Sequence, residues 1–91
     1  MTRKDVIWQA LASIYSHNKK MNPGTMTEAL AEELDSMWDE FETEARNWIE
    51  TGDSLTYLVQ QKIWIWFAGG GTAEIAARRV IEAVDNANAS G

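Results

Sequence analysis

Apolar residues recur every three to four positions near the start of the chain, which is the spacing of one face of an α-helix. This first run consists of Val6, Ile7, Ala10, Leu11, Ile14 and Tyr15. Thr2 and Asp5 lie three residues apart, as in a helix capping box. We therefore expect a helix over about residues 2–19, followed by a turn at residues 22–24, where a proline and a glycine stand together.

The clearest pattern predicts one long helix over about residues 26–51. Thr25 and Glu28 match a capping box at its start, and Gly52 suits the position just after its end. The apolar stripe advances about 3.6 residues per step, which is the period of an α-helix. This stripe, which Trp38 and Ile49 widen, consists of Leu30, Leu34, Met37, Phe41, Ala45 and Trp48.

Residues 54–68 fit two kinds of structure. As a strand, they alternate between two apolar faces and are rich in residue types that favour β structure. An isolated strand is unstable, however, and no second strand-like run in the chain could pair with it. We therefore expect a helix, with a broad apolar face made of Leu55, Leu58, Val59, Ile63, Trp66 and Phe67.

Three glycines at residues 69–71 separate a last helix, which we expect Thr72 to cap. Its expected core residues are Ile75, Ala77, Val80, Ile81 and Val84. Residues 86–91 are small and polar, and we expect them to fray. The whole pattern predicts a single all-α domain over residues 1–91, a small four-helix bundle with one long acidic helix at about 26–51.

Composition limits the chemistry and the cellular location that we expect for this chain. The chain has no cysteine, so disulfides and cysteine zinc sites are excluded. The N-terminus lacks the continuous apolar stretch of a secretory signal, and the most apolar run, residues 63–68, is too short to span a membrane. We therefore expect a cytoplasmic protein that does not bind membranes.

Charge is unevenly distributed. The formal net charge is −6, and ten of the fourteen acidic residues lie between Glu28 and Asp53, where Arg46 is the only basic residue. A negative surface disfavours contact with nucleic-acid phosphates and favours a basic partner, unless it is simply a solvated helix face. Basic residues such as Arg3 and Lys4 form no continuous stripe, so we do not expect direct nucleic-acid binding.

The candidate chemical motifs are incomplete. His17 is the only histidine, and nothing marks a nucleophile or an oxyanion hole beside it. The glycines before Thr72 lack the lysine of a phosphate-binding loop. The acid pair Glu32 and Glu33 lies on a helix, without the spacing of a calcium loop or a di-iron motif. We therefore expect no catalytic residues, no metal and no cofactor.

Five consecutive large apolar residues, 63–67, would cover every side of a helix. Such a helix is either buried on all sides or exposes an apolar patch, and a domain this small can rarely surround a helix completely. All five side chains could still fit in the core. We expect instead that at least one of Trp64, Ile65 and Trp66 lies at an interface with a partner or a second subunit.

The long helix offers a second candidate surface. Acidic residues recur on it at three- to four-residue steps and form a stripe of like charge, which consists of Glu28, Glu32, Asp35, Asp39 and Glu42. A basic partner would offset their mutual repulsion and associate faster. The same spacing could also mimic a row of nucleic-acid phosphates.

These features predict a non-enzymatic protein-binding module, a small acidic inhibitor or adaptor that sequesters a protein partner, and we also expect a homodimer. The alternatives are a nucleic-acid mimic of the kind that phages encode and a structural subunit of an assembly. In size, acidity and helix content the chain is similar to bacteriocin immunity proteins and phage-encoded inhibitors. That similarity lies in bulk properties, and no motif carries it.

Overall fold

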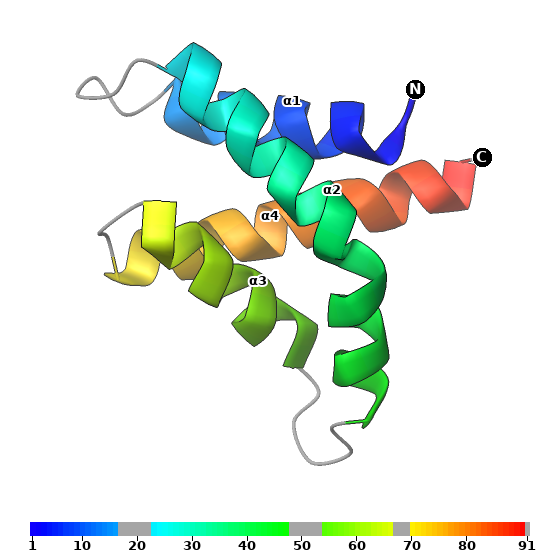
Figure 1. The fold of residues 1–91 in the computed structure, drawn as a ribbon. Coiled ribbons are helices and arrows are strands. Elements are labelled where there is room, and N and C mark those ends of the chain that lie inside the picture. Colours follow the sequence, from blue (N-terminus) through cyan, green and yellow to red (C-terminus); the bar gives the residue numbers. More distant parts are fainter. Residues whose placement is uncertain (17–22, 48–53, 67–69, 91) are drawn as a thin grey trace.

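The computed structural model describes residues 1–16, 23–47, 54–66 and 70–90. They form four helices (Figure 1), which are α1 (Arg3–Tyr15), α2 (Pro23–Asn47), α3 (Ser54–Trp66) and α4 (Gly70–Ser90). The predicted fold, a small all-α four-helix bundle with one long acidic helix, is confirmed.

The four helices pack in a closed circuit. Helices α1 and α3 each lie against both α2 and α4. The 25-residue α2 is the longest helix, and it curves so that its first part lies beside α1 and its last part beside α3 (Figure 1). The two chain termini lie on the same side of the molecule. Helix α2 therefore contacts both α1 and α3, and the placement of these two helices depends on it.

The start of α1 is fixed by the predicted capping box. The backbone N–H of Asp5 donates to the Thr2 hydroxyl over 3.2 Å, and the backbone N–H of Thr2 donates to the Asp5 carboxylate over 3.1 Å. The backbone hydrogen bond from Thr2, followed by its side-chain bond, lowers the pKa of Asp5. Thr2 and Asp5 therefore satisfy two backbone donors that the helix itself leaves unpaired.

The end of α1 comes earlier than expected. The helix stops at Tyr15, and Ser16 is its C-cap, with a backbone N–H that still reaches the Ala12 carbonyl over 2.9 Å. The Ser16 hydroxyl donates to the Ser13 carbonyl, a local bond that competes with helix continuation. The expected end near residues 18–20 lies outside the described residues.

The starts of α2 and α4 correct two of the predicted caps. Helix α2 begins at Pro23, so Thr25 is its third residue rather than its N-cap, and Pro23 and Gly24 belong to the helix rather than to a turn. Proline suits the first helical position because its φ is already helical and its missing N–H has no partner there. Helix α4 likewise begins at Gly70, two residues before Thr72.

The ends of α2 and α4 can be compared with the prediction only in part. Asn47 is the last described helical residue of α2, and the expected end at residues 48–52 lies outside the described residues. Helix α4 continues to Ser90, so residues 86–90 are helical in the structure. Fraying of these last turns in solution stays a prediction.

All four helices contribute to one core. Its two largest fully buried side chains are Trp38 and Tyr15, and burying a large apolar side chain stabilises a fold by about 3 kcal/mol. The predicted stripes of α1 and α2 and the inner side of α4 together supply most of the rest. The core consists of Ile7, Leu11, Tyr15, Leu30, Ala31, Leu34, Trp38, Phe41, Val59, Ile63, Ala73, Ala76, Ala77, Val80 and Val84.

The buried face of α4 matches the predicted one at Ala77, Val80 and Val84 but not at Ile75. Ile75 is 56% exposed, although we expected it in the core, whereas Ala73 and Ala76 are fully buried. With Ala77, these alanines form a smooth surface on which α1 and α3 can pack closely. Helix approach, rather than side-chain size, therefore decides which face of α4 is buried.

Residues 54–66 form a helix, as expected, and no strand occurs among the described residues. Its first residue, Ser54, is buried, and its hydroxyl donates to the carbonyl of Ala45 over 2.9 Å. Ala45 lies in the last turn of α2, where carbonyls lack partners within the helix. This bond therefore joins the start of α3 to the end of α2.

One buried polar group gives a first test of the core. The Thr27 side chain is fully buried, and its hydroxyl has no hydrogen-bond partner in the part of the chain that the structure describes. Replacing it with valine keeps the shape and removes an unsatisfied group. We expect Thr27→Val to raise the free energy of unfolding by about 1 kcal/mol, as measured by urea denaturation.

The matched control is Thr43→Val on the same helix. The exposed Thr43 hydroxyl donates to the Asp39 carbonyl over 2.8 Å, so its loss should change stability by no more than about 0.5 kcal/mol. A lower stability of Thr27→Val than of the wild type would contradict the description of an unsatisfied hydroxyl.

Candidate protein-contact surface

The outward side of α3 exposes three large side chains. The exposed fractions are 49% for Tyr57, 51% for Trp64 and 76% for Ile65. Positions 57, 61, 64 and 65 follow one another at three- to four-residue steps, so these side chains share one side of the helix. Val59 and Ile63 occupy the opposite side and are buried.

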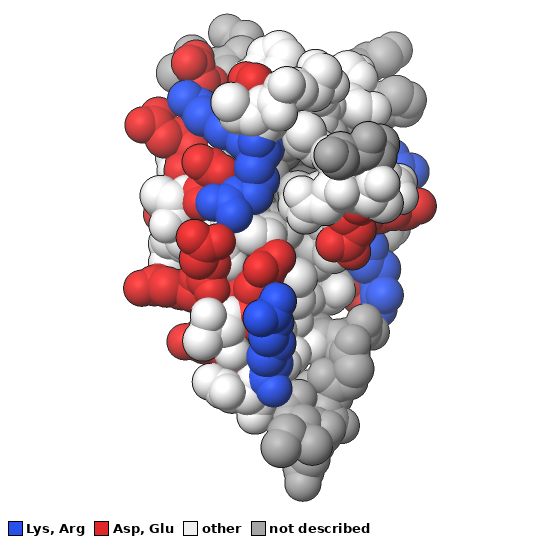
Figure 2. All heavy atoms as spheres, turned by 90° about the vertical axis from the view of Figure 1, so that its right-hand side faces the viewer, with Lys and Arg blue, Asp and Glu red and all other residues white. Residues whose placement is uncertain are grey.

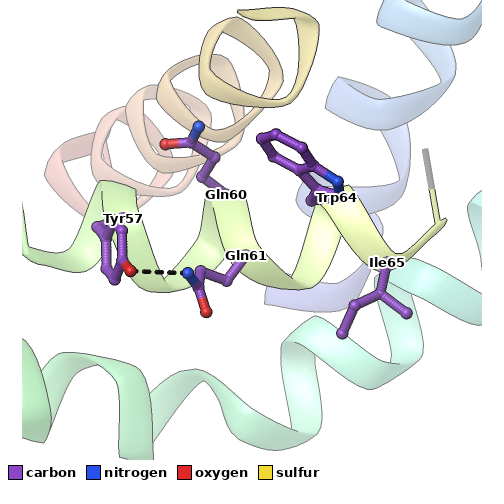
Figure 3. Close-up of a pocket in the computed structure, with 5 residues that line it drawn as sticks. All are labelled: Tyr57, Gln60, Gln61, Trp64 and Ile65. Atoms are coloured by element: carbon purple, nitrogen blue, oxygen red, sulfur yellow. Dashed lines mark hydrogen bonds between the residues drawn. The ribbon is translucent and has the colours of Figure 1, made fainter. Parts of the chain in front are cut away.

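These residues line a shallow hollow of about 410 Å³. Figure 3 looks onto this side of the helix, with Gln60 and Trp64 toward one edge of it and Ile65 toward the other. The Gln61 amide donates to the Tyr57 hydroxyl over 2.8 Å and so joins two consecutive turns. The α3 face, as we call Tyr57, Gln60, Gln61, Trp64 and Ile65, contains no charged residue.

One carboxylate on α2 contacts two side chains of α3. Glu33 forms an ion pair with the Lys62 ammonium through one oxygen and accepts a hydrogen bond of 3.0 Å from the Trp66 indole through the other. Lys62 and Trp66 lie one turn apart on the side of α3 that faces α2. With both held, the α3 face is turned toward solvent.

The electrostatics of Glu33 follow from these contacts. The hydrogen bond from Lys62 is the largest cause that lowers the pKa of Glu33 below its ordinary value of 4.5, and the bond from Trp66 acts in the same direction. Both donors stabilise the ionised carboxylate, whereas partial burial opposes them. Glu33 is therefore held in the charged form that both donors require.

The structure separates the three apolar residues that we expected at an interface. Trp64 and Ile65 are exposed, whereas Trp66 is half-buried, packs against the core and donates to Glu33. Trp66 thus holds α3 against α2. Of these three residues, only Trp64 and Ile65 belong to the α3 face. Phe67, the last residue of the apolar run, lies outside the described residues.

The acidic stripe on α2 is partly engaged by α1. The Arg3 guanidinium donates to the Asp35 carboxylate over 2.7 Å, to the Asp35 backbone carbonyl over 3.0 Å and to the Asp39 carboxylate over 3.1 Å. The hydrogen bond to Asp35 is the largest cause that raises the pKa of Arg3. Two of the five expected acidic contact residues therefore hold the start of α1.

The other members of the stripe behave differently from one another. The Lys4 ammonium lies 3.9 Å from the exposed Glu32 carboxylate, and Glu42 accepts a 3.1 Å hydrogen bond from the Trp38 indole. Glu28 is exposed at the edge of a small hollow beside Lys4. Figure 2 shows the result, with basic side chains lying among the acidic ones on this face.

The described residues form neither a metal-binding group nor a membrane-spanning helix. They contain no group of three or more histidine or acidic side chains that could hold a metal ion. Where the structure describes the chain, none of its helices is long and apolar enough to cross a membrane. His17 lies outside the described residues.

Comparison with known proteins adds no relative. No protein family, no curated protein and no solved structure matches this chain.

Sequence reasoning missed several residues that shape this surface. Tyr57, Gln60 and Gln61 lie on the α3 face, yet the helical pattern alone drew attention only to the apolar run after them. Glu33 and Lys62 also went unrecognised as a pair. Their separation of 29 positions gives no local signal, because such a contact depends on how α2 and α3 pack.

The contact between α1 and α2 can be tested at Arg3. Lysine keeps the positive charge but cannot reproduce the three donated bonds, so we expect Arg3→Lys to lower the free energy of unfolding by about 1 kcal/mol. Urea denaturation at low and high salt measures this loss. Arg79→Lys, an exposed position on α4, is the control, and an equal loss in both variants would contradict the arrangement.

The contact between α2 and α3 should depend on pH through Glu33. Its pKa is lower in the folded chain, so ionised Glu33 stabilises the fold above pH 4.5. This stabilisation is lost as the pH falls through the folded-state pKa. We expect Glu33→Gln to cost about 1 kcal/mol near pH 7, and the difference from wild type to shrink in acid.

Denaturation curves across a pH series measure this effect. Glu44→Gln, an exposed carboxylate on the same helix, serves as the matched control and should track the wild type. If the cost of Glu33→Gln were the same at pH 7 and at pH 3, the carboxylate would not be acting through its charge.

Proposed function

We propose that this chain is a non-enzymatic protein-binding module whose contact surface is the α3 face. The observation that carries the proposal is the exposure of Trp64 and Ile65 on one side of a helix that Glu33 holds in place. Exposed apolar side chains that gather in one uncharged patch are typical of contact sites in soluble proteins.

The residue types of the α3 face support a protein partner. Tryptophan and tyrosine are enriched among the residues that dominate binding energy, because they bring large apolar area with few rotatable bonds. The glutamines beside them can both donate and accept hydrogen bonds at the rim of a contact. An apolar centre with a polar surround matches the usual arrangement of a protein–protein interface.

The acidic stripe supports the proposal less strongly than the α3 face does. Arg3 and Lys4 already neutralise part of it, and charge reversal at Asp35 would break a bond that holds α1. A partner with a basic surface would have to compete with these contacts. A phosphate mimic would present a continuous row of negative charges. Here the basic side chains of Arg3 and Lys4 interrupt that row.

Photo-cross-linking tests the proposal directly. A photoreactive amino acid replaces Gln61 on the α3 face or, as the matched control, the exposed Gln9 on α1. We expect protein adducts from position 61 in extracts of the source cells and none above background from position 9. The cross-linked protein is then identified, purified and titrated with the unmodified chain.

Alanine substitutions give the quantitative arm. Trp64→Ala should weaken the affinity for that purified protein at least tenfold, because truncating a central aromatic residue removes much of an interface's binding energy. Trp8→Ala, an exposed tryptophan on α1, is the control for a general loss of tryptophan. Circular dichroism checks that both variants remain helical. Equal binding by both variants would rule out the α3 face as the contact.

A further inference from the structure

We propose that the occupant of the α3 face is a second copy of this chain, with the two α3 helices antiparallel across a two-fold axis near Gln61. This inference rests on the proposed function, because it names the partner for the same surface. It is drawn from charge, from the order of the side chains along α3 and from the chemistry of the residue at the centre.

Charge favours this face for self-association. Each copy carries a formal net charge of −6, so two copies repel each other wherever their acidic surfaces meet. A two-fold axis brings residues near it against their own equivalents in the other copy, so any charge there meets a like charge. The α3 face has no charged residue in its lining and avoids this repulsion.

The order of side chains along α3 is self-complementary. Tyr57 and Ile65 lie four residues on either side of Gln61, which is about one helical turn in each direction. When the second helix runs antiparallel about Gln61, Tyr57 of each copy faces Trp64 and Ile65 of the other. Aromatic and aliphatic surfaces then meet on both sides of the axis, and each contact occurs twice.

The residue at the centre suits a two-fold axis. A glutamine amide carries both donors and acceptors, so two Gln61 side chains can bond to each other without leaving a group unpaired. A carboxylate or an ammonium at this point would face its own charge. In the single chain, the Gln61 amide is already oriented by its bond to the Tyr57 hydroxyl.

The exposed area is adequate for a weak dimer. Half-exposed Tyr57 and Trp64 and three-quarters-exposed Ile65 offer on the order of 350 Å² of side-chain surface. A standard interface takes about 800 Å² from each partner, so these residues would form its centre and their neighbours its rim. We therefore expect a weak dimer, at the small end of specific interfaces.

The absence of cysteine makes a direct test possible. In the Gln61→Cys variant, two thiols should meet at the axis, so mild oxidation or a short bismaleimide should give a covalent dimer. Gln9→Cys, at an exposed site on α1, is the matched control for random collision. Light scattering of the wild type over a concentration series should show a dimer, and Trp64→Ala should weaken it at least tenfold.

The outcomes separate the two proposals. Rapid cross-linking of Gln61→Cys, with slow cross-linking of Gln9→Cys, supports the second copy. A wild type that stays monomeric at millimolar concentration, with equal cross-linking of the two variants, overturns it. In that case a different protein captured by the photoreactive residue at position 61 upholds the α3 face as a contact surface, whereas no adduct there overturns the proposed function as well.

Discussion

The Glu33 carboxylate joins α2 to α3 through two side chains, Lys62 and Trp66. The apolar face predicted for α3 turns inward, with Val59 and Ile63 buried and Trp66 packed against the core. The ion pair with Lys62 and the hydrogen bond from Trp66 hold α3 against α2 in this rotation. Partly buried polar contacts can favour one arrangement of two helices even when they add little net stability.

The acidic residues of α2 form ion pairs with neighbouring helices as well as interacting with solvent. Asp35 and Asp39 hold Arg3 at the start of α1, and Glu33 holds the end of α3. The carboxylates of one helix therefore arrange its two neighbours. An acidic helix is best understood here as a scaffold to which cationic side chains of α1 and α3 attach.

The periodicity of the sequence predicted the helices and most of the core of α1 and α2, because those stripes follow a single period over many residues. It failed at Ile75, since it weighed side-chain size and the packing of α4 depends on alanines. It also predicted the inward face of α3, where Val59 and Ile63 are buried and Trp66 packs against the core, and left Trp64 and Ile65 off that face. It could not predict that the Trp66 indole donates to Glu33, a partner 33 positions away.

The alanines on the inner side of α4 limit how this protein can change over generations. Ala73, Ala76 and Ala77 carry only a methyl group as side chain, and any enlargement would push α1 or α3 outward. Exchange for glycine would weaken the helix instead. Both a larger and a smaller side chain are therefore unfavourable on this inner side of α4. The stability of the single chain places no such restriction on the exposed Trp64 and Ile65.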